Sequence, residues 1–298
     1  MSRIHYDLCP VCKSNYINPL LTVKDYSVSG EDFVIWQCSQ CRLRFTQDVP
    51  DEQSIGDYYK STDYISHTNT AKGFINKLYQ RVRNYTLKQK ADLVIGHTVK
   101  QGKLLDVGAG IGAFLHTMRG KGWDILGIEP DEGAKQQAKK LFGIELIETS
   151  EFDNLPDNSF DAITLWHVLE HVHELHSYVE KLKSLLRIDG KIFIAVPNYE
   201  AKDHSIYKLF WAAYDVPRHL YHFSPKAMDV LMKQHGLKII SKKPMWFDSF
   251  YISLLSSKYK NRGFTNWLGA AMSGLRSNLN AVLNKDRCSS IIYIIEKA

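Results

Sequence analysis

The chain has no apolar run approaching the ~18 residues that span a bilayer, and its N-terminus has no apolar segment typical of a signal peptide. We therefore expect a cytoplasmic protein. It also has no strong excess of charge, because 38 basic residues face 32 acidic ones, and a net charge of +6 does not require a nucleic-acid partner. The chain contains neither an internal repeat nor a low-complexity tract. Its 298 residues, 44% of them apolar, suffice for one large globular domain and a small one.

Cysteine is scarce, but four of the five cysteines form two C-x-x-C pairs, at residues 9–12 and 38–41. Two such pairs suit a tetrahedral zinc ion, although the gap between them is longer than usual in a zinc ribbon. A reducing cytosol argues against two disulfides. A redox motif would be a single pair near the start of a helix. We therefore predict a zinc-binding ribbon over residues 1–50, with a structural ion held by Cys9, Cys12, Cys38 and Cys41. Cys288 is left as a buried thiol.

A glycine-rich turn follows an apolar strand in residues 103–115, KLLDVGAGIGAFL. Gly108, Gly110 and Gly112 permit a left-handed backbone and a close approach to a ligand, and the next helix directs its N–H groups to the same place. Asp106 precedes the turn. A carboxylate there would repel a pyrophosphate and attract a cation, so the pattern favours an ammonium or sulfonium metabolite over a dinucleotide.

The D-x-G-x-G-x-G pattern of residues 106–112 resembles motif I of the class I S-adenosylmethionine-dependent methyltransferases. Later segments resemble the same family in the right order: strand 124–128, loop 151–161, strand 162–166 and strand 190–198. The turn also satisfies G-x-G-x-x-G/A, as in nicotinamide and flavin enzymes, but Asp106 and the H-V-L-E-H segment at 167–171 fit methyl transfer better.

The resemblance implies roles for individual residues. Glu129, which follows strand 124–128, would accept hydrogen bonds from the ribose hydroxyls. Glu151 and the N–H group of Phe152 would contact the adenine. Trp166, at the end of the fourth strand, would complete the cofactor site.

Strands and helices alternate along the core, which predicts an α/β fold with parallel strands. The resemblance makes this a seven-stranded Rossmann-like sheet that ends in an antiparallel pair, at 237–243 and 289–296. We expect helices near 112–120, 132–142, 174–187 and 225–235. The predicted division is a zinc-binding ribbon (1–50), a helical connector (51–95), the methyltransferase core (96–247 and 288–298) and a helical insertion or lid (248–287).

The insertion carries an apolar stripe at helical spacing between Phe264 and Leu283, with polar residues opposite. Three interpretations are open. The stripe packs against the core, it forms a lid over an apolar substrate, or it is an interfacial helix with Lys258, Lys260 and Arg262 near lipid headgroups.

Methyl transfer to oxygen requires an aligned nucleophile and the removal of its proton. His167, Glu170 and His171 follow the fourth strand, and Arg218, His219 and His222 follow the fifth. The H-x-x-E-H spacing matches a metalloprotease signature, but no long helix surrounds it.

Some related O-methyltransferases resemble E-x-x-E-H at this position and bind a divalent ion. Here His167 replaces the first acid. Three hypotheses are open: a second divalent metal ion at His167, Glu170 and His171, completed by His219 or His222; a histidine as general base; or a structural role for these residues.

The combination of zinc ribbon and methyltransferase core resembles bacterial enzymes of the "methyltransferase domain 23" type, which act on nucleotide-linked sugars and cell-envelope intermediates. The core has no N/D-P-P-Y motif, which argues against methylation of amino groups on bases or glutamine. We therefore expect methyl transfer to an oxygen of a small-molecule, sugar- or lipid-linked substrate, with S-adenosylmethionine as cofactor and with peripheral membrane contact left open. The alternative is a nucleic-acid-binding or RNA methyltransferase that uses the zinc ribbon and the basic segment 72–103.

Overall fold

The computed structural model describes residues 2–59, 74–98, 101–261 and 264–298. Its centre is a mixed sheet of six strands in the order β11-β12-β9-β8-β6-β7. Neighbouring strands among β6, β7, β8 and β9 pair in parallel, and β12 is antiparallel to both β9 and β11. The strands are β6 (Lys103–Val107), β7 (Asp124–Ile128), β8 (Phe160–Trp166), β9 (Leu186–Pro197), β11 (Leu237–Pro244) and β12 (Ser290–Lys297). Beyond β7, the expected seventh strand is represented by a parallel bridge between Ile128 and Ile147.

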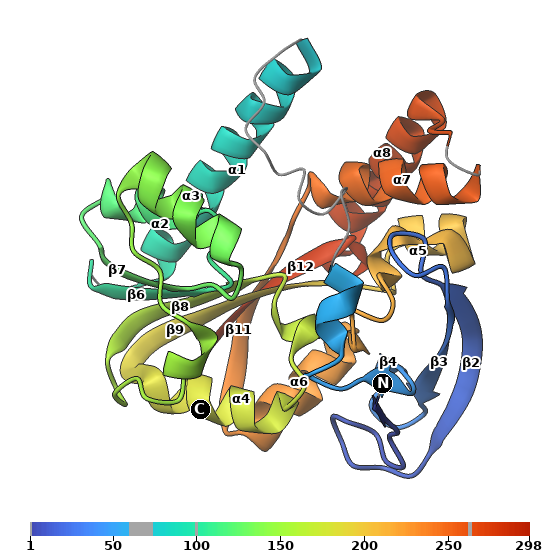
Figure 1. Ribbon diagram of the computed structural model, residues 1–298, viewed down its shortest axis with the longest axis horizontal. Coiled ribbons are helices and arrows are strands. Elements are labelled where there is room, and N and C mark those ends of the chain that lie inside the picture. The colour runs from blue at the N-terminus through green and yellow to red at the C-terminus, as the bar shows by residue number, and fades with distance from the viewer. Residues whose placement is uncertain (1, 60–73, 99–100, 262–263) are drawn as a thin grey trace.

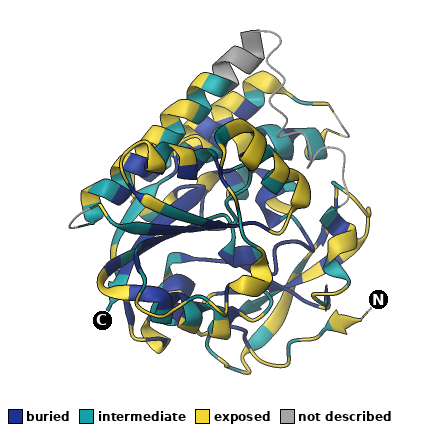
Figure 2. Ribbon diagram, turned by 60° about the vertical axis from the view of Figure 1, so that its left-hand side comes forward, coloured by how far each residue is buried: buried dark blue, intermediate teal, exposed yellow. Residues whose placement is uncertain are grey.

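Helices cover both faces of this sheet (Figure 1). On one face lie α1 (Phe74–His97), α2 (Ala113–Arg119) and α3 (Glu132–Phe142), and on the other lie α4 (Leu175–Leu185) and α6 (Pro225–Gln234). The sheet between them is largely buried, while the helices expose their outer sides (Figure 2). The α/β class and these elements confirm the sequence prediction.

Local capping explains where two of these helices begin. The side chain of Asp131 accepts a hydrogen bond from Ala134 N at 2.7 Å and caps α3. Ser224 caps α6 in the same way, with Pro225 in the first turn. The short 3₁₀ segments are Ile55–Tyr59, Thr149–Glu151, Leu169–His171, Lys208–Phe210, Ala212–Tyr214 and Lys285–Arg287, and α5 spans Lys202–Tyr207.

The N-terminal module shares a sheet with the core. It contains β1 (Arg3–Ile4), β2 (Ile17–Lys24), β3 (Asp32–Cys38), β4 (Arg44–Thr46) and β5 (Val49–Pro50). One of its sheets has the order β10-β4-β3-β2, in which β10 (Tyr221–His222) comes from the chain segment between α5 and α6. Tyr221 pairs with Phe45 and His222 with Arg44. The module is therefore joined to the core by backbone hydrogen bonds.

Of the predicted connector at 51–95, residues 60–73 lie outside the described residues. So do Lys72 and Lys100 of the basic segment. The remainder includes the 3₁₀ segment 55–59 and most of α1.

The insertion forms two packed helices, α7 (Asp248–Lys260) and α8 (Trp267–Leu283). They stand at the upper right of Figure 1, away from the middle of the sheet. The large side chains of the α8 stripe are exposed, whereas Ala270, Ser273, Gly274 and Ser277 face inward. The interpretation of this stripe as core packing is therefore wrong, because small residues take the inward face.

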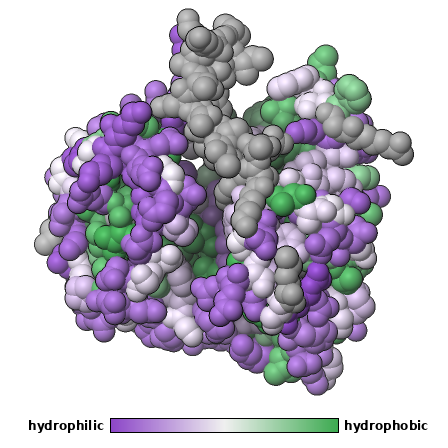
Figure 3. All heavy atoms as spheres, viewed as in Figure 1, coloured by the Kyte–Doolittle hydropathy of each residue, from purple (hydrophilic) through white to green (hydrophobic). Residues whose placement is uncertain are grey.

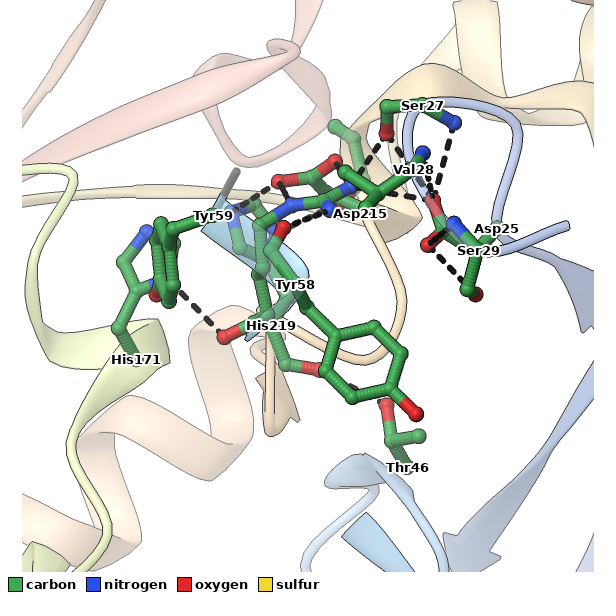
Figure 4. A network of polar contacts seen from close by, with 12 residues as sticks. Asp25, Ser27, Val28, Ser29, Thr46, Tyr58, Tyr59, His171, Asp215 and His219 are labelled. Carbon is green, nitrogen blue, oxygen red and sulfur yellow. Dashed lines mark hydrogen bonds and ion pairs between the residues drawn. The ribbon is translucent and has the colours of Figure 1, made fainter. Parts of the chain in front are cut away.

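A buried ion cluster centred on Arg218 closes the junction between module and core. The Arg218 guanidinium donates to Asp215 at 3.0 and 2.6 Å and to the carbonyl oxygen of Tyr58 at 2.7 Å. It also lies 3.4 Å from Asp25, whose carboxylate accepts backbone N–H groups from its own loop, among them Ser27 and Ser29. Figure 4 shows how the module loop, the 3₁₀ segment at Tyr58 and the segment of Asp215 converge. The Arg218 charge and these hydrogen bonds outweigh burial and lower the pKa of Asp25 and Asp215.

We expect Arg218→Met to lower the free energy of unfolding by about 3–5 kcal/mol, because it leaves two carboxylates without their buried cation. Arg187→Met is the matched control. Arg187 pairs with Asp161 at 2.6 Å, but its side chain is 45% exposed, so the loss should stay below about 1 kcal/mol. Urea unfolding of both variants measures the difference, and equal losses would contradict the account.

Candidate functional site

The predicted cofactor turn lies between β6 and α2. Gly108, Gly110 and Gly112 have φ values of +70°, +54° and +74°, which L-residues with side chains rarely adopt. A Cβ at Gly108 would lie 2.6 Å from Val168 Cγ2, so a side chain there has no space. At Gly110 no heavy atom lies within 4 Å of that position. The glycines are thus required by backbone conformation, and the middle of the turn is open to a ligand.

Asp106 ends up buried beneath this turn, with 1% of its surface exposed. Its Oδ1 accepts a hydrogen bond of 2.6 Å from the Thr164 hydroxyl on β8. Burial raises the pKa of Asp106 to about 7, against the opposing effects of Thr164 and Lys90. The ionised form of this buried carboxylate would be stabilised by a further positive charge nearby.

Glu129 lies on the other side of the turn, where β7 ends. Its carboxylate accepts hydrogen bonds from Gly110 N at 2.7 Å and Asp131 N at 3.0 Å. Burial raises the pKa of Glu129, although these two N–H groups oppose the rise. The two carboxylates therefore flank the glycine turn, as the sequence predicts.

Glu151 and Phe152 lie on the loop between α3 and β8, and they differ from each other in burial. Glu151 is exposed at the end of the 3₁₀ segment Thr149–Glu151. The N–H group of Phe152 already donates to Thr149 O at 3.0 Å, and its ring stacks on Tyr178 at 4.6 Å. Phe152 thus has a clear role in holding the loop, and its N–H group is engaged within the 3₁₀ turn.

Trp166 ends β8 beside a residue that sequence reasoning did not select, Lys90 of α1. The Lys90 ammonium lies 4.3 Å from the centre of the Trp166 ring. Burial lowers the pKa of Lys90, while the charges of Asp248 and Asp106 act in the opposite direction. Among the described residues, the buried Trp166 Nε1 has no hydrogen-bond partner. The sequence does not reveal which side of α1 meets the core, so it gives no signal for the position of Lys90.

His167 begins the polar segment after β8 with a φ of +62°. Its ring lies between two carboxylates, with Nδ1 3.2 Å from Glu170 and Nε2 2.9 Å from Asp248. Burial opposes a charge here, but the hydrogen bonds to Asp248 and Glu170 outweigh it and raise the pKa of His167 to about 10. A histidine that carries a proton at neutral pH and is bonded on both nitrogens does not suit the role of general base. Asp248, the first residue of α7, was also missed from sequence.

His171 and His219 meet at the carboxyl end of the sheet, although 48 positions separate them. Their rings are edge to face with centroids 4.6 Å apart. Nδ1 of His171 lies 3.0 Å from Arg218 O, and Nδ1 of His219 lies 2.9 Å from Ala213 O. A carbonyl oxygen only accepts, so we assign the proton to Nδ1 in both rings, which leaves each Nε2 with a lone pair.

Glu170 completes this group. Potential ligand atoms of Glu170, His171 and His219 all lie within 4.8 Å of one another. Glu170 is fully buried, and its Oε2 has no hydrogen-bond partner among the described residues. The expected metal group therefore has His219 as a member, while His167 turns toward Asp248.

The N-terminal module positions His219. The backbone N–H group of Thr46 on β4 donates a hydrogen bond of 2.9 Å to Leu220 O. The Thr46 hydroxyl donates to His219 O at 2.8 Å and lies 3.1 Å from Nε2 of His222. His222 is buried, and burial holds its pKa well below the usual range. His222 thus braces the junction.

The four cysteines of the module form one cluster. The Sγ atoms of Cys9 and Cys41 are 3.5 Å apart and those of Cys12 and Cys38 are 3.6 Å apart, so no disulfide joins them. Each C-x-x-C pair ends in the same turn: Lys13 N donates to Cys9 O, and Arg42 N donates to Cys38 O, both at 3.0 Å. All four ligand atoms lie within 4.8 Å of one another.

Comparison with known proteins identifies the family. The model of the Methyltransf_23 methyltransferase domain matches residues 79–242, which is more than half of the chain. An uncharacterized methyltransferase of Alkaliphilus oremlandii is 30% identical over 158 residues, which cover 50% of this chain and 72% of that protein. The mitochondrial ubiquinone biosynthesis O-methyltransferase of Bos taurus is 26% identical over 57% of this chain and 50% of its own length.

Solved structures agree on the fold. Magnesium protoporphyrin IX methyltransferase from Synechocystis superposes with a TM-score of 0.54 and 14% identity, over 83% of this chain and all of that one. A Burkholderia thailandensis 1,6-didemethyltoxoflavin-N1-methyltransferase gives a TM-score of 0.51 and 12% identity over 93% of this chain and all of that one. No helix among the described residues has the length and apolar character needed to cross a membrane. The chain belongs to the Methyltransf_23 family and is a class I S-adenosylmethionine-dependent methyltransferase with an N-terminal four-cysteine module.

Proposed function

We propose that this enzyme methylates an oxygen atom of a small-molecule, sugar- or lipid-linked acceptor. The observation that carries the proposal is the meeting of His171 and His219 beside Glu170, with Nδ1 of each ring facing a carbonyl oxygen. Such a group is suited to receive a hydroxyl proton. The ubiquinone biosynthesis O-methyltransferase from Bos taurus supports transfer to oxygen, but it matches over only half of its length.

In the proposed site, Asp106 and Glu129 hold S-adenosylmethionine over the glycine turn. Asp106 balances the cationic end of the cofactor, and Glu129 accepts hydrogen bonds from the ribose. Glu151, Phe152 and Trp166 stay proposed contacts of the adenine side, with the Phe152 N–H group needing to leave its 3₁₀ turn.

The reaction is an in-line displacement. The acceptor oxygen forms a bond to the methyl carbon while the sulfur–methyl bond breaks. The electron pair of the broken bond stays on sulfur, which gives S-adenosylhomocysteine. The hydroxyl proton moves to Nε2 of His171. Burial lowers the pKa of His171 to about 4, so its ring is neutral at neutral pH. His167 is protonated and keeps Glu170 and Asp248 in place.

Glu170, His171 and His219 also fit a divalent metal ion, because the buried Glu170 Oε2 has no partner among the described residues and both histidines present a lone pair. When bound, such an ion would orient substrate oxygens and lower the pKa of a hydroxyl group. His167 would hold Glu170 from outside the group. This interpretation and the general-base hypothesis use the same three residues.

The basic segment gives the nucleic-acid hypothesis little support. Arg81 and Lys88 of this segment are exposed. Lys90, however, lies over Trp166, and Lys103 lies 5.4 Å from the centre of the Phe160 ring. These charges are directed at the core surface of the domain. A small-molecule acceptor is the hypothesis that the site favours.

We further propose that Cys9, Cys12, Cys38 and Cys41 bind one structural zinc ion. A Zn–S bond of ~2.3 Å in a tetrahedron places sulfur atoms roughly 3.8 Å apart, close to the separations found here. Four thiolates leave no open position for substrate, so the ion stabilises the module that carries β4.

Asp106 generates a pH prediction. A cationic ligand requires the ionised carboxylate, and the pKa of Asp106 is about 7. S-adenosylhomocysteine affinity should therefore be level above pH 7.5 and fall by about tenfold per pH unit below pH 7. Asp106→Asn should bind more weakly at pH 8 and show no such slope, as measured by calorimetry.

Thr164→Val is the matched variant for this test, because valine keeps the shape and removes the hydrogen bond that lowers the pKa of Asp106. The midpoint of the affinity curve should move to higher pH. A wild-type curve in Asp106→Asn would exclude this residue from the cofactor site.

His171→Gln and His219→Gln should each lower turnover by about 10²–10⁴-fold while S-adenosylhomocysteine affinity stays within about threefold. The acceptor is first found by measuring S-adenosylhomocysteine release with a panel of phenols, polyprenyl phenols and nucleotide sugars. His116→Gln is the control, because His116 is exposed and stacks on Phe142 of α3. Unchanged turnover in both site variants would refute the proposed roles.

Dialysis against EDTA separates the two chemical hypotheses. A metal-assisted enzyme loses activity and regains it with a divalent ion, whereas a histidine base keeps its activity. The zinc of the module must be assayed in the same samples, since four-thiolate sites bind more tightly than mixed sites of two histidines and one carboxylate.

Loss of zinc should separate turnover from cofactor binding. Cys41→Ser should lower the metal content below the expected one zinc per chain and abolish turnover, because β4 no longer holds β10 and His219. S-adenosylhomocysteine affinity should persist, since the cofactor turn lies on β6 and β7. Cys288→Ala is the control and should keep its zinc. An active, zinc-free Cys41→Ser enzyme would contradict this role.

A further inference from the structure

The outer face of α8 is an apolar surface with no cover in the described part of the chain. We define this face by Trp267, Leu268, Met272, Leu275, Leu279, Val282 and Leu283. Their side chains are between 51% and 87% exposed. Hydrophobic residues gather over α7 and α8 at the upper right of Figure 3. A contiguous apolar helix face of this kind marks a contact surface.

The orientation of α8 is fixed from its inner side. A Cβ at Gly274 would lie 2.6 Å from Phe250 Cδ1, so α7 and α8 are in close contact there. Ser277 donates a hydrogen bond of 2.8 Å to Asp203, which is fully buried. Turning the leucines inward would break this bond and require space that α7 occupies. The apolar face is therefore a stable property of the fold.

Basic residues dominate the charge around this face. Residues 249–285 contain no Asp or Glu and five basic residues: Lys258, Lys260, Arg262, Arg276 and Lys285. Lys260, Arg276 and Lys285 are exposed. At 100° per residue, Arg276 borders the outer face of α8. Lys260 ends α7 near the start of α8, where Asn266 N donates to Ser257 Oγ at 2.9 Å, and Lys285 follows the end of α8.

We propose that the outer face of α8 binds the surface of an anionic phospholipid bilayer. The helix lies flat, its leucines enter the acyl boundary, and the basic residues at both ends and along one side contact lipid phosphates. Charge complementarity selects this occupant over a second copy of the chain. Two copies paired through α8 would bring their basic residues together, because the acidic residues at the two ends of the hairpin already pair elsewhere, Asp248 with His167 and Asp286 with Lys242.

This contact goes beyond methyl transfer and does not depend on it. The hairpin nevertheless lies next to the site, because Asp248 at the start of α7 bonds to His167 at 2.9 Å. Membrane contact would therefore place the candidate site near the bilayer surface, where a lipid-linked acceptor is found.

Co-sedimentation of the full chain with vesicles tests the proposal. The vesicles are phosphatidylcholine alone, or phosphatidylcholine with one third phosphatidylglycerol. The variants are Leu275→Glu/Leu279→Glu for the apolar face and Arg276→Gln for the charge. Ile188→Glu is the matched control, because Ile188 is 75% exposed at the start of β9, outside the hairpin. Wild-type circular dichroism and S-adenosylhomocysteine affinity in all variants show that each is folded.

We expect the wild type and Ile188→Glu to sediment with anionic vesicles and to stay in solution with neutral ones. The leucine variant should bind anionic vesicles more weakly than the wild type, by a factor on the order of ten or greater. Arg276→Gln should also bind less tightly than the wild type, with a smaller salt dependence. Wild-type protein that stays in solution with anionic vesicles would overturn the proposal. So would equal binding to neutral vesicles, or a wild-type dimer in sedimentation velocity that the leucine variant dissociates.

Discussion

The pairing of β4 with β10 is the constraint on which the candidate site depends. It joins a small cysteine-rich module to the segment of His219, which the core also contacts through the bridge between Asn198 and Phe223 and the hydrogen bond from Leu220 N to Glu170 O. Thr46 bonds to Leu220 and His219, and Arg218 adds a buried ion cluster to the same junction. Without this strand, the segment of His219 would lose its hydrogen bonds to Thr46. We therefore infer that the module affects the candidate site by positioning His219, and not through its own cysteines.

Charge is distributed unevenly on the two sides of the site. On the cofactor side, Asp106 and Glu129 are buried carboxylates whose pKa values are raised by burial. A cationic partner would stabilise the ionised form of both. On the acceptor side, His167 is held as a cation by Asp248 and Glu170, whereas burial keeps His171 neutral. Two histidines four residues apart thus differ in protonation because their neighbours differ. We propose that the two carboxylates stabilise the cationic end of the cofactor and that the neutral histidine accepts the proton of the acceptor.

The sequence was sufficient to predict the sheet class, the glycine turn, the cluster of four cysteines and the positions of Asp106 and Glu129 at the ends of neighbouring strands. These features are local, since each is determined by a short pattern of residue types along the chain. The partnership of His171 with His219 could only be suspected, because it depends on how β10 pairs with β4. Lys90 and Asp248 had no local signal, since a lysine on a helix and an acid at a helix start are common on surfaces. The expectation that the α8 stripe packs on the core failed for a related reason. Helical periodicity shows that a helix has an apolar side, but the packing of small residues at Gly274 and Ser277 decides which side faces inward.

The protonation of His171 and His167 is the most direct test of the account. Nitrogen-15 spectra of histidine-labelled protein at pH 7.5 report the proton on each ring nitrogen. The account predicts a neutral His171 with its proton on Nδ1 and a lone pair on Nε2, together with a doubly protonated His167. A His171 ring that carries its proton on Nε2, or that is charged at this pH, would contradict the assignment of that residue as the proton acceptor.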